Sequence, residues 1–245
     1  MISTKKLFHA FLVDIEAKIG TKSWGRAGTF GNCCGADESM DLSNKSNLWV
    51  WGMSLGLYSK SYQETKGNTK YTINGEMIHR FKYHVGLEQV ERDAIVNNFT
   101  LQVSDAIVTE LAAGYPHRQS PPFDVCLGPP ENRDTGHSLP RNICRNLADK
   151  HDWIRDGFAG ITKTRKGEVI KEFSHKERPS KLQGLYEIDR NRFPSPESGF
   201  LIIDDVFETG STLEAMCNTL EIEFPKIPRF VVTLTHLHAT ERMSN

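Results

Sequence analysis

The chain has 245 residues, of which 38% are hydrophobic and 25% are charged, and its formal net charge at pH 7 is −1. This balance is typical of a globular protein, and it offers no overall charge that would attract nucleic acid or an anionic membrane. No stretch approaches the ~18 apolar residues of a membrane span. The five cysteines are scattered and odd in number, which favours reduced thiols in the cytoplasm.

The N-terminal part of the chain is predicted to form a helix, a loop and two strands. Residues 1–20 carry the apolar stripe of an amphipathic helix, and no signal-peptide cleavage site follows them. Residues 21–47 are rich in Gly, Ser, Asn and Thr, which indicates a loop. Residues 48–58 and a second run near Tyr71 favour strands, which polar residues between them could join as a hairpin.

The next two segments are predicted to be helical, and the second, residues 87–112, forms one or two helices. Residues 75–84 combine a helical start with three basic side chains that either face an anion or complete the helix dipole, namely Arg80, Lys82 and His84. Residues 87–112 carry an apolar stripe that a core-facing helix explains fully. Residues 114–122 are rich in Pro, Gly and His and indicate a linker.

A short buried strand is predicted over 123–127, and the Gly-Pro-Pro sequence after it cannot continue as a helix. The backbone must therefore turn sharply at Pro129 and Pro130, with Arg133 a few residues further on. Ligands of open α/β sheets bind outside the carboxyl ends of the strands. We expect a constrained loop over 128–133 at such an edge.

Three weaker patterns lie on either side of the most informative stretch. A helix is predicted over 139–149, and the mixed-charge segment 163–178 indicates either a solvated hairpin or a mobile hood that closes over a ligand. Near the C-terminus, residues 230–234 favour a strand. His236 and His238 would face the same way beyond it, as metal ligands do, but no third ligand accompanies them.

The most informative stretch covers residues 200–212 and reads Phe-Leu-Ile-Ile-Asp-Asp-Val-Phe-Glu-Thr-Gly-Ser-Thr. Its apolar start is typical of a strand buried on both faces of a parallel sheet. Asp204 and Asp205 follow where this strand would leave the core, and adjacent strand residues point to opposite faces. Four small or hydroxylated residues then precede a helical pattern over 213–222: Thr209, Gly210, Ser211 and Thr212.

A strand, an acidic turn, a hydroxyl-rich loop and a helix in this order predict a phosphate-binding loop. The helix start offers free N–H groups and the positive end of its dipole to an anion. Gly210 lets the backbone approach closely, and the hydroxyl groups add donors. The order of residues excludes a Walker A loop and the dinucleotide-binding fingerprint. The alternative is a strand that ends in solvent-facing acids before an ordinary capped helix.

This stretch resembles the phosphoribosyl-pyrophosphate (PRPP) motif of type I phosphoribosyltransferases. The resemblance implies an α/β fold, an open parallel sheet with helices on both faces, over residues 76–245, with residues 1–75 as an α+β extension. It implies that Asp204 and Asp205 lie by the ribose and a mostly water-mediated Mg²⁺, and that 209–212 hold the 5′-phosphate. The pyrophosphate would lie against Pro129, Pro130 and Arg133.

Three further segments resemble the competence-protein-F-like (ComF-like) subgroup in the order of that family: 78–83, 124–130 and 177–186. The resemblance implies a glycosyltransferase of nucleotide metabolism that uses Mg²⁺ to move 5-phosphoribosyl from PRPP to a nitrogen nucleophile such as a nucleobase. A homodimer is compatible with it. Glu208 stands where the hypoxanthine-guanine type has an acid near the acceptor base. It is either a general base or a solvated side chain that favours the helix start.

Two other functions stay open. A PRPP- or nucleotide-sensing protein would keep the phosphate loop without turnover, and the replacement of the subgroup's Arg-Gly-Phe-Asn signature near 136–139 favours it. The intact acidic pair with Glu208 favours the enzyme. An adaptor in DNA uptake is suggested by the subgroup's name alone, and no basic stripe supports it. The sequence does not identify the acceptor.

Overall fold

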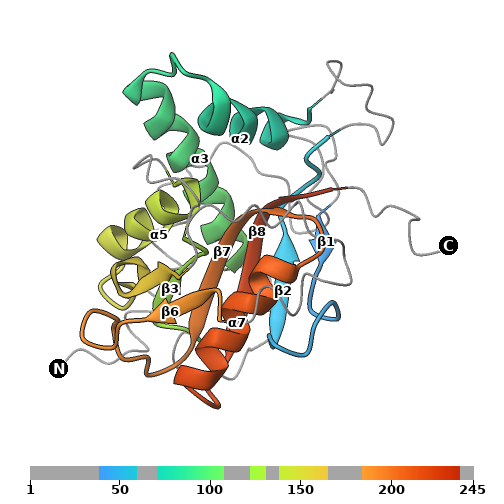
Figure 1. Cartoon of the computed structure of the whole chain (residues 1–245). Helices are drawn as coiled ribbons and strands as arrows, with labels where there is room; N and C mark the ends of the chain where they lie inside the picture. The colour runs from blue at the N-terminus through green and yellow to red at the C-terminus, as the bar shows by residue number, and fades with distance from the viewer. Residues whose placement is uncertain (1–38, 60–70, 108–121, 131–137, 165–183, 238–245) are drawn as a thin grey trace, which may run out of the picture.

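The computed structural model describes residues 39–59, 71–107, 122–130, 138–164 and 184–237 (Figure 1). They form a six-stranded sheet in the order β1-β2-β8-β7-β3-β4 and a separate two-stranded ribbon of β5 and β6. The strands of the large sheet are β1 (Met40–Asp41), β2 (Trp51–Ser54), β3 (Val125–Leu127), β4 (Arg155–Asp156), β7 (Phe200–Phe207) and β8 (Arg229–His236). The ribbon strands are β5 (Ile161–Lys163) and β6 (Tyr186–Ile188).

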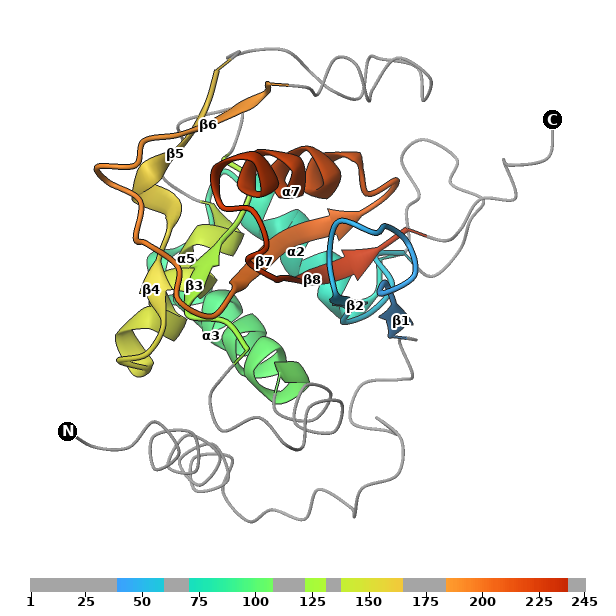
Figure 2. The same ribbon diagram turned by 90° about the horizontal axis from the view of Figure 1, so that it is seen from below.

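The large sheet is parallel except at one edge. Only β1 runs antiparallel to its neighbour, β2, whereas β2, β8, β7, β3 and β4 pair in parallel. The helices of the described residues are α2 (Ile73–Tyr83), α3 (Gln89–Ala106), α5 (Leu139–Lys150) and α7 (Ser211–Glu223), with a short 3-10 helix, η2, at Phe158–Gly160. Figure 2 shows α7 on one face of the sheet and α3 and α5 on the other. The predicted open α/β sheet with helices on both faces is confirmed.

Capping side chains fix where the helices begin. The Thr72 hydroxyl accepts a hydrogen bond from the Gly75 N–H at the start of α2, and Ser138 does the same for Arg141 in α5. Glu88 and Glu91 form a capping box at the start of α3. Each cap satisfies an N–H group that has no partner within its helix. The structure confirms the helices predicted over 75–84, 139–149 and 213–222, with shifted bounds, and it has one helix, α3, in the described part of 87–112.

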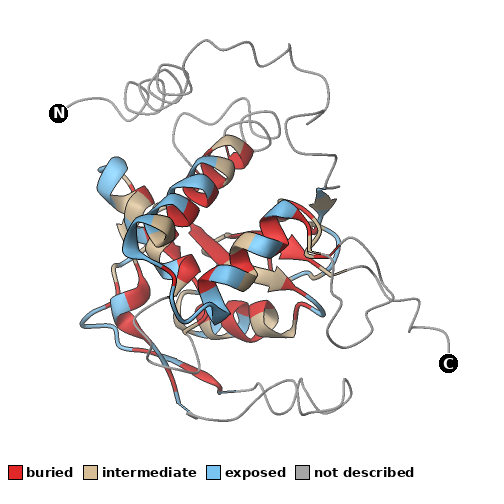
Figure 3. Ribbon diagram, turned by 90° about the horizontal axis from the view of Figure 1, so that it is seen from above, coloured by how far each residue is buried: buried red, intermediate tan, exposed pale blue. Residues whose placement is uncertain are grey.

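The buried faces of these elements form one core. All four residues from Phe200 to Ile203 are fully buried, as the continuous apolar run predicts. In α3, Phe99 and Val103 are fully buried on the face that meets the sheet and α5. Figure 3 shows the same division, with exposed residues on the outward faces of the helices and buried ones toward the sheet. The stripe over 87–112 is core-facing within α3.

The described part of the N-terminal segment belongs to the large sheet. Residues of β2 pair with β8 from Trp51↔Phe230 to Ser54↔Thr233, and β1 lies within the region predicted as loop. The possible hairpin between residues 48–58 and Tyr71 stays a prediction: the described residues show one antiparallel bridge, Ser59 with Tyr71, and residues 60–70 lie outside the described ranges. The boundary near residue 75 stays a prediction, and residues 1–38 lie outside the described ranges.

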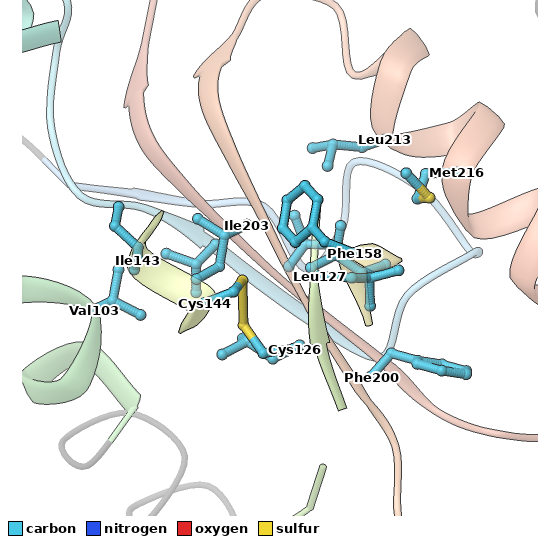
Figure 4. Close-up of a cluster of buried hydrophobic side chains, with 14 of the residues drawn as sticks. Val103, Cys126, Leu127, Ile143, Cys144, Phe158, Phe200, Ile203, Leu213 and Met216 are labelled. Carbon is cyan, nitrogen blue, oxygen red and sulfur yellow. A yellow bond between two sulfur atoms is a disulfide. The ribbon is translucent and has the colours of Figure 1, made fainter. Parts of the chain in front are cut away.

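The cysteines correct a second expectation. The structure joins Cys126 of β3 to Cys144 of α5 in a disulfide within the core (Figure 4), so the expected reduced state is wrong for this pair. Cys217 is a free, buried thiol, and burial raises the pKa of that thiol to about 12. Scattered spacing could not predict the pairing because only the packing of α5 on β3 brings the two sulfur atoms together.

Two further expectations concern membranes and metals. In the described ranges, no helix combines the length and the hydropathy needed to cross a membrane. His236 is buried, and its Nδ1 lies 3.0 Å from the hydroxyl of Ser54. No cluster of three or more His, Cys, Asp or Glu suited to a metal ion occurs among the residues that the structure describes. The second histidine of the predicted pair, His238, lies outside them.

Candidate functional site

The carboxyl ends of β3 and β7 lie side by side in the middle of the sheet. Val125 pairs with Phe200 and Leu127 with Ile202. From β3 the chain continues through α5 to β4 on one side, and from β7 through α7 to β8 on the other. These two strands therefore form the topological switch point of the sheet, where open α/β folds bind ligands. The prediction that the strands over 123–127 and 200–205 are neighbours is confirmed.

Gly128 brings the loop after β3 against β7. A Cβ atom at this position would lie 2.3 Å from the carbonyl oxygen of Ile203, so no larger residue fits without moving the backbone. Pro129 is buried and Pro130 is half-buried directly after it. The chain thus leaves the sheet level with Ile203, one residue before Asp204. Arg133, the third residue predicted for this loop, lies outside the described residues.

The loop between β7 and α7 has the predicted geometry. Gly210 adopts a left-handed conformation, with φ of 79°, immediately before the first residue of α7. The hydroxyl groups of Thr209 and Ser211 lie 2.9 Å apart, and Thr209 is exposed. The first N–H groups of a 13-residue helix therefore open onto a loop with hydroxyl groups. Phosphate binding by this loop stays a prediction.

Phe207 and Gly210 hold this loop against the core. The Leu237 N–H donates to the Phe207 carbonyl oxygen over 3.0 Å. A Cβ atom on Gly210 would lie 3.0 Å from the Phe207 ring, and its positive φ would strain any other residue. Between these two points, Glu208 is exposed at the surface. The backbone of the loop is therefore fixed while the Glu208 side chain is accessible.

Asp204 and Asp205 lie within β7, three and two residues before its end at Phe207, and both are half-buried. The acidic turn predicted after the strand is therefore part of the strand itself. The Asp205 N–H donates to Asp204 Oδ1 over 2.9 Å. The Asp205 carboxylate forms an ion pair with the ammonium of Lys82, which reaches it from the last turn of α2. Lys82 is one of the three basic residues predicted either to face an anion or to complete the helix dipole, and its anionic partner in the structure is Asp205. Arg80 instead pairs with Glu91 over 2.7 Å at the surface.

Burial and charge set the protonation of this cluster. Burial and then the Asp205 charge raise the pKa of Asp204 to about 7, against the lowering effects of the hydrogen bond from Asp205 and of Lys82. Burial alone would lower the pKa of Lys82, but Asp205 raises it above its usual value. Burial and then Asp204 raise the pKa of Tyr186 on β6. Tyr186 is therefore a neighbour of the acidic pair that the sequence did not suggest.

A buried hydroxyl group lies beside Asp204. Thr233 on β8 is in register with Asp204, and paired positions of parallel strands point to the same face of a sheet. Its Oγ1 atom is fully buried and has no hydrogen-bond partner among the described residues. Buried polar atoms without a partner are rare and costly. Asp204 thus adjoins a buried hydroxyl group for which the described residues supply no partner.

Replacing Asp204 by asparagine is expected to stabilise the free protein at neutral pH. The pKa of Asp204 is about 7 in the folded protein, and the usual value of an aspartate, which applies to the unfolded chain, is 3.8. The folded state therefore binds the proton of this carboxyl group more tightly than the unfolded state does. The free energy of unfolding of the parent protein should therefore fall as pH rises from about 4 to about 7. Asp204→Asn removes the ionisable carboxyl group and with it this loss of stability at neutral pH.

Urea unfolding of both proteins, at about pH 5 and about pH 8, checks this expectation. The stabilisation by Asp204→Asn should be larger at the higher pH. Asp149→Asn, which changes an exposed acid at the end of α5, is the control and should show no such trend. Equal effects of Asp204→Asn at both pH values would contradict the assignment of a raised pKa to Asp204.

No family model matches this chain, and no curated protein matches it. Among solved structures, a crystal structure of adenine phosphoribosyltransferase aligns with 56% of this chain and 71% of its own, at 20% identity and a TM-score of 0.33. A second, adenine phosphoribosyltransferase from Saccharomyces cerevisiae with adenine and D-2,5-dideoxy-2,5-imino-altritol 1,6-bisphosphate, aligns with 56% of this chain and 69% of its own, at 20% identity and a TM-score of 0.32. Such likeness is too weak to assign a function.

Proposed function

We propose that this chain binds PRPP together with Mg²⁺ and transfers the 5-phosphoribosyl group to a nitrogen nucleophile such as a nucleobase. One observation carries the proposal. A single strand at the switch point of the sheet delivers the acidic pair and the hydroxyl-rich loop, next to the Gly128 turn. An acidic patch between two anion-binding loops suits a sugar with a phosphate at each end and hydroxyl groups between them.

The 5′-phosphate would bind in the loop before α7. Ser211 and Thr212 lie in the first turn of this helix, where free N–H groups and the helix dipole favour an anion. The hydroxyl groups of Thr209 and Ser211, 2.9 Å apart, can both turn toward a phosphate oxygen. The pyrophosphate would lie along the turn at Pro129 and Pro130, with Arg133 as its cationic partner.

Asp204 and Asp205 would position the ribose hydroxyl groups and the cation that PRPP brings. Carboxylate oxygen is the ligand type that Mg²⁺ prefers, and this ion keeps much of its water. Two adjacent carboxylates, with the Thr233 hydroxyl in register with Asp204, would suit a hydrated ion whose other ligands are PRPP oxygens. When bound, Mg²⁺ would neutralise charge on the leaving pyrophosphate.

The transfer breaks the bond between the ribose C1 and a pyrophosphate oxygen and forms a bond between C1 and the acceptor nitrogen. Positive charge builds on the ribose ring while pyrophosphate leaves with the bonding electrons. This chain would contribute by holding both phosphate ends and aligning the nucleophile. The acceptor nitrogen loses a proton, and the exposed carboxylate of Glu208 is our candidate to take it.

A PRPP-sensing protein without turnover is the second candidate. The ion pair of Lys82 with Asp205 favours it, because an acidic group with a partner of its own is less available to a substrate. Lys82 is also part of the 78–83 segment on which the proposed ComF-like subgroup rests. Incubation with PRPP, Mg²⁺ and a panel of nucleobases, with detection of released pyrophosphate, separates the two. PRPP binding without base-dependent pyrophosphate release would favour the sensor.

The double variant Asp204→Asn plus Asp205→Asn is expected to fold and to weaken PRPP binding at least ~10-fold in the presence of Mg²⁺, since bonds to charged groups contribute about 1.5–3 kcal/mol. Calorimetric titration with PRPP measures it. The matched control is Asp149→Asn plus Asp152→Asn, which removes two exposed acids at the opposite end of the sheet. Equal PRPP affinity of the two double variants would refute the assigned role of the acidic pair.

A further inference from the structure

The ion pair of Lys82 with Asp205 joins two elements far apart in the sequence. Lys82 lies in the last turn of α2, and Asp205 in the part of β7 that leads to the phosphate loop. The helix is held in place by the Thr72 cap and by the burial of Ile78 and Phe81. The backbone of α2 is therefore fixed, and the ammonium reaches the acidic pair at the end of the flexible Lys82 side chain.

The Lys82 side chain can change its conformation. The Lys82 side chain is 29% exposed and that of Asp205 is 16% exposed, so the pair lies at the boundary of the solvent. Lysine carries its charge at the end of four rotatable carbons and can exchange one anionic partner for another without a change of backbone. Nothing in the α2 helix has to unwind for the ammonium to leave Asp205.

We propose that Lys82 is an internal counter-cation of the acidic pair. In the absence of PRPP, the ion pair of its ammonium with Asp205 prevents free divalent cations from binding there. When PRPP binds together with Mg²⁺, the ammonium leaves Asp205 and pairs with phosphate oxygens of PRPP. This inference rests on the proposed function. It assigns to Lys82 the control of when the cation site becomes available. Mg²⁺ would then enter as the PRPP complex and not ahead of it.

The ligand count supports exclusion of free cations. Asp204 and Asp205 are neighbours in β7 and the charges of both act on Lys82, and no third His, Cys, Asp or Glu completes a metal cluster within the described residues. Mg²⁺ requires near-octahedral oxygen coordination and gives up water reluctantly. An anchored ammonium already paired with one of the two carboxylates is therefore a strong competitor. PRPP changes the balance because it offers oxygen ligands to the cation and anionic partners to Lys82.

The Thr233 hydroxyl supports a hydrated cation at the acidic pair independently of Lys82. Its Oγ1 atom is buried beside Asp204 without a partner in the part of the chain that the structure describes. The ammonium of Lys82 satisfies Asp205 but leaves this atom unsatisfied. A hydrated cation at the acidic pair would bring water molecules that can donate to Thr233 Oγ1 and accept from it. Among the described residues, Lys82 thus supplies a partner to Asp205, and none is found for the Thr233 hydroxyl beside Asp204.

Binding of Mn²⁺ alone, measured by electron paramagnetic resonance without PRPP, tests the proposal. The parent protein should bind Mn²⁺ weakly, and Lys82→Met should bind it about 10- to 100-fold more tightly, since the lost interaction is a charge-assisted hydrogen bond. Lys82→Gln serves as a second variant if Lys82→Met does not fold. Lys82→Arg keeps a cation and should resemble the parent. Arg80→Met, which removes a surface cation from the same helix, is the matched control.

Calorimetric titration with PRPP and Mg²⁺ completes the test. Lys82→Met should bind this complex more weakly than the parent, in contrast to its tighter binding of Mn²⁺ alone. Unchanged Mn²⁺ affinity in folded Lys82→Met and Lys82→Gln would overturn the proposal, and so would tight Mn²⁺ binding by the parent. Failure of the parent and Arg80→Met to bind PRPP would instead refute the proposed function, since the Mn²⁺ measurement contains no PRPP.

Discussion

Ser211→Glu is expected to weaken PRPP binding by at least ~10²-fold, because juxtaposed like charges cost several kcal/mol. Ser211 is the first residue of α7, and its hydroxyl lies 2.9 Å from that of Thr209 in the proposed 5′-phosphate loop. A carboxylate here would lie where the phosphate is expected and would occupy the helix N-terminus itself. Calorimetric titration with PRPP in the presence of Mg²⁺ measures the loss.

In Ser211→Glu, PRPP binding is expected to be weakened while the stability of the fold is kept. A negative side chain in the first turn interacts favourably with the helix dipole, so Ser211→Glu should be at least as stable as the parent. Ser195→Glu is the matched control, because Ser195 is exposed before β7, at the opposite end of that strand. If both variants bound PRPP like the parent, the loop before α7 would not be the phosphate site.

The sequence predicted the central part of the fold because it is encoded locally. The apolar run over 200–203, followed by acids, is typical of a strand with both faces covered, and Gly210 next to hydroxyl residues indicates the turn into a helix. The Gly-Pro-Pro turn after β3 is local in the same way. Two such strands, each ending in a turn, are best placed side by side in a parallel sheet, and they are.

The partners of these elements could not be predicted, because they depend on packing between distant segments. The apolar pattern of β2 indicates a strand, but not that it pairs in parallel with β8. The disulfide of Cys126 with Cys144 follows from the position of α5 on β3. In the site, the spacing of basic residues in α2 left three candidates for an anion, and only the structure selects Lys82 and gives Asp205 as its partner.

The same limit explains the missed residues of the site. Asp204 raises the pKa of Tyr186, which lies on β6 in a separate ribbon, and Thr233 lies beside Asp204 only through the pairing of β7 with β8. Neither residue belongs to a motif. A hydrophobic strand with a threonine in it, such as β8, is ordinary in sequence, and the signal appears only when the hydroxyl is found buried without a partner.

Glu208→Gln is expected to keep PRPP binding and to lower turnover with any accepted base by ~10²–10⁴-fold, the usual effect of losing a general base. Glu208 lies between Phe207, whose carbonyl oxygen accepts from Leu237, and the Thr209-Gly210 turn. Its backbone is thus fixed beside the proposed phosphate loop while its side chain is exposed. The amide keeps the size and polarity of the acid but cannot accept the proton of the acceptor nitrogen.

The competing interpretation is a solvated carboxylate that only favours the start of α7. Glu214→Gln distinguishes the two, because Glu214 lies in the first turn of the same helix and its carboxylate interacts with the same dipole. Steady-state kinetics of pyrophosphate release should give a lower kcat for Glu208→Gln and an unchanged kcat for Glu214→Gln, with similar small changes in stability for both. Full activity of Glu208→Gln would leave Glu208 as a surface residue without a role in proton transfer, and the base would have to come from the acceptor or from solvent.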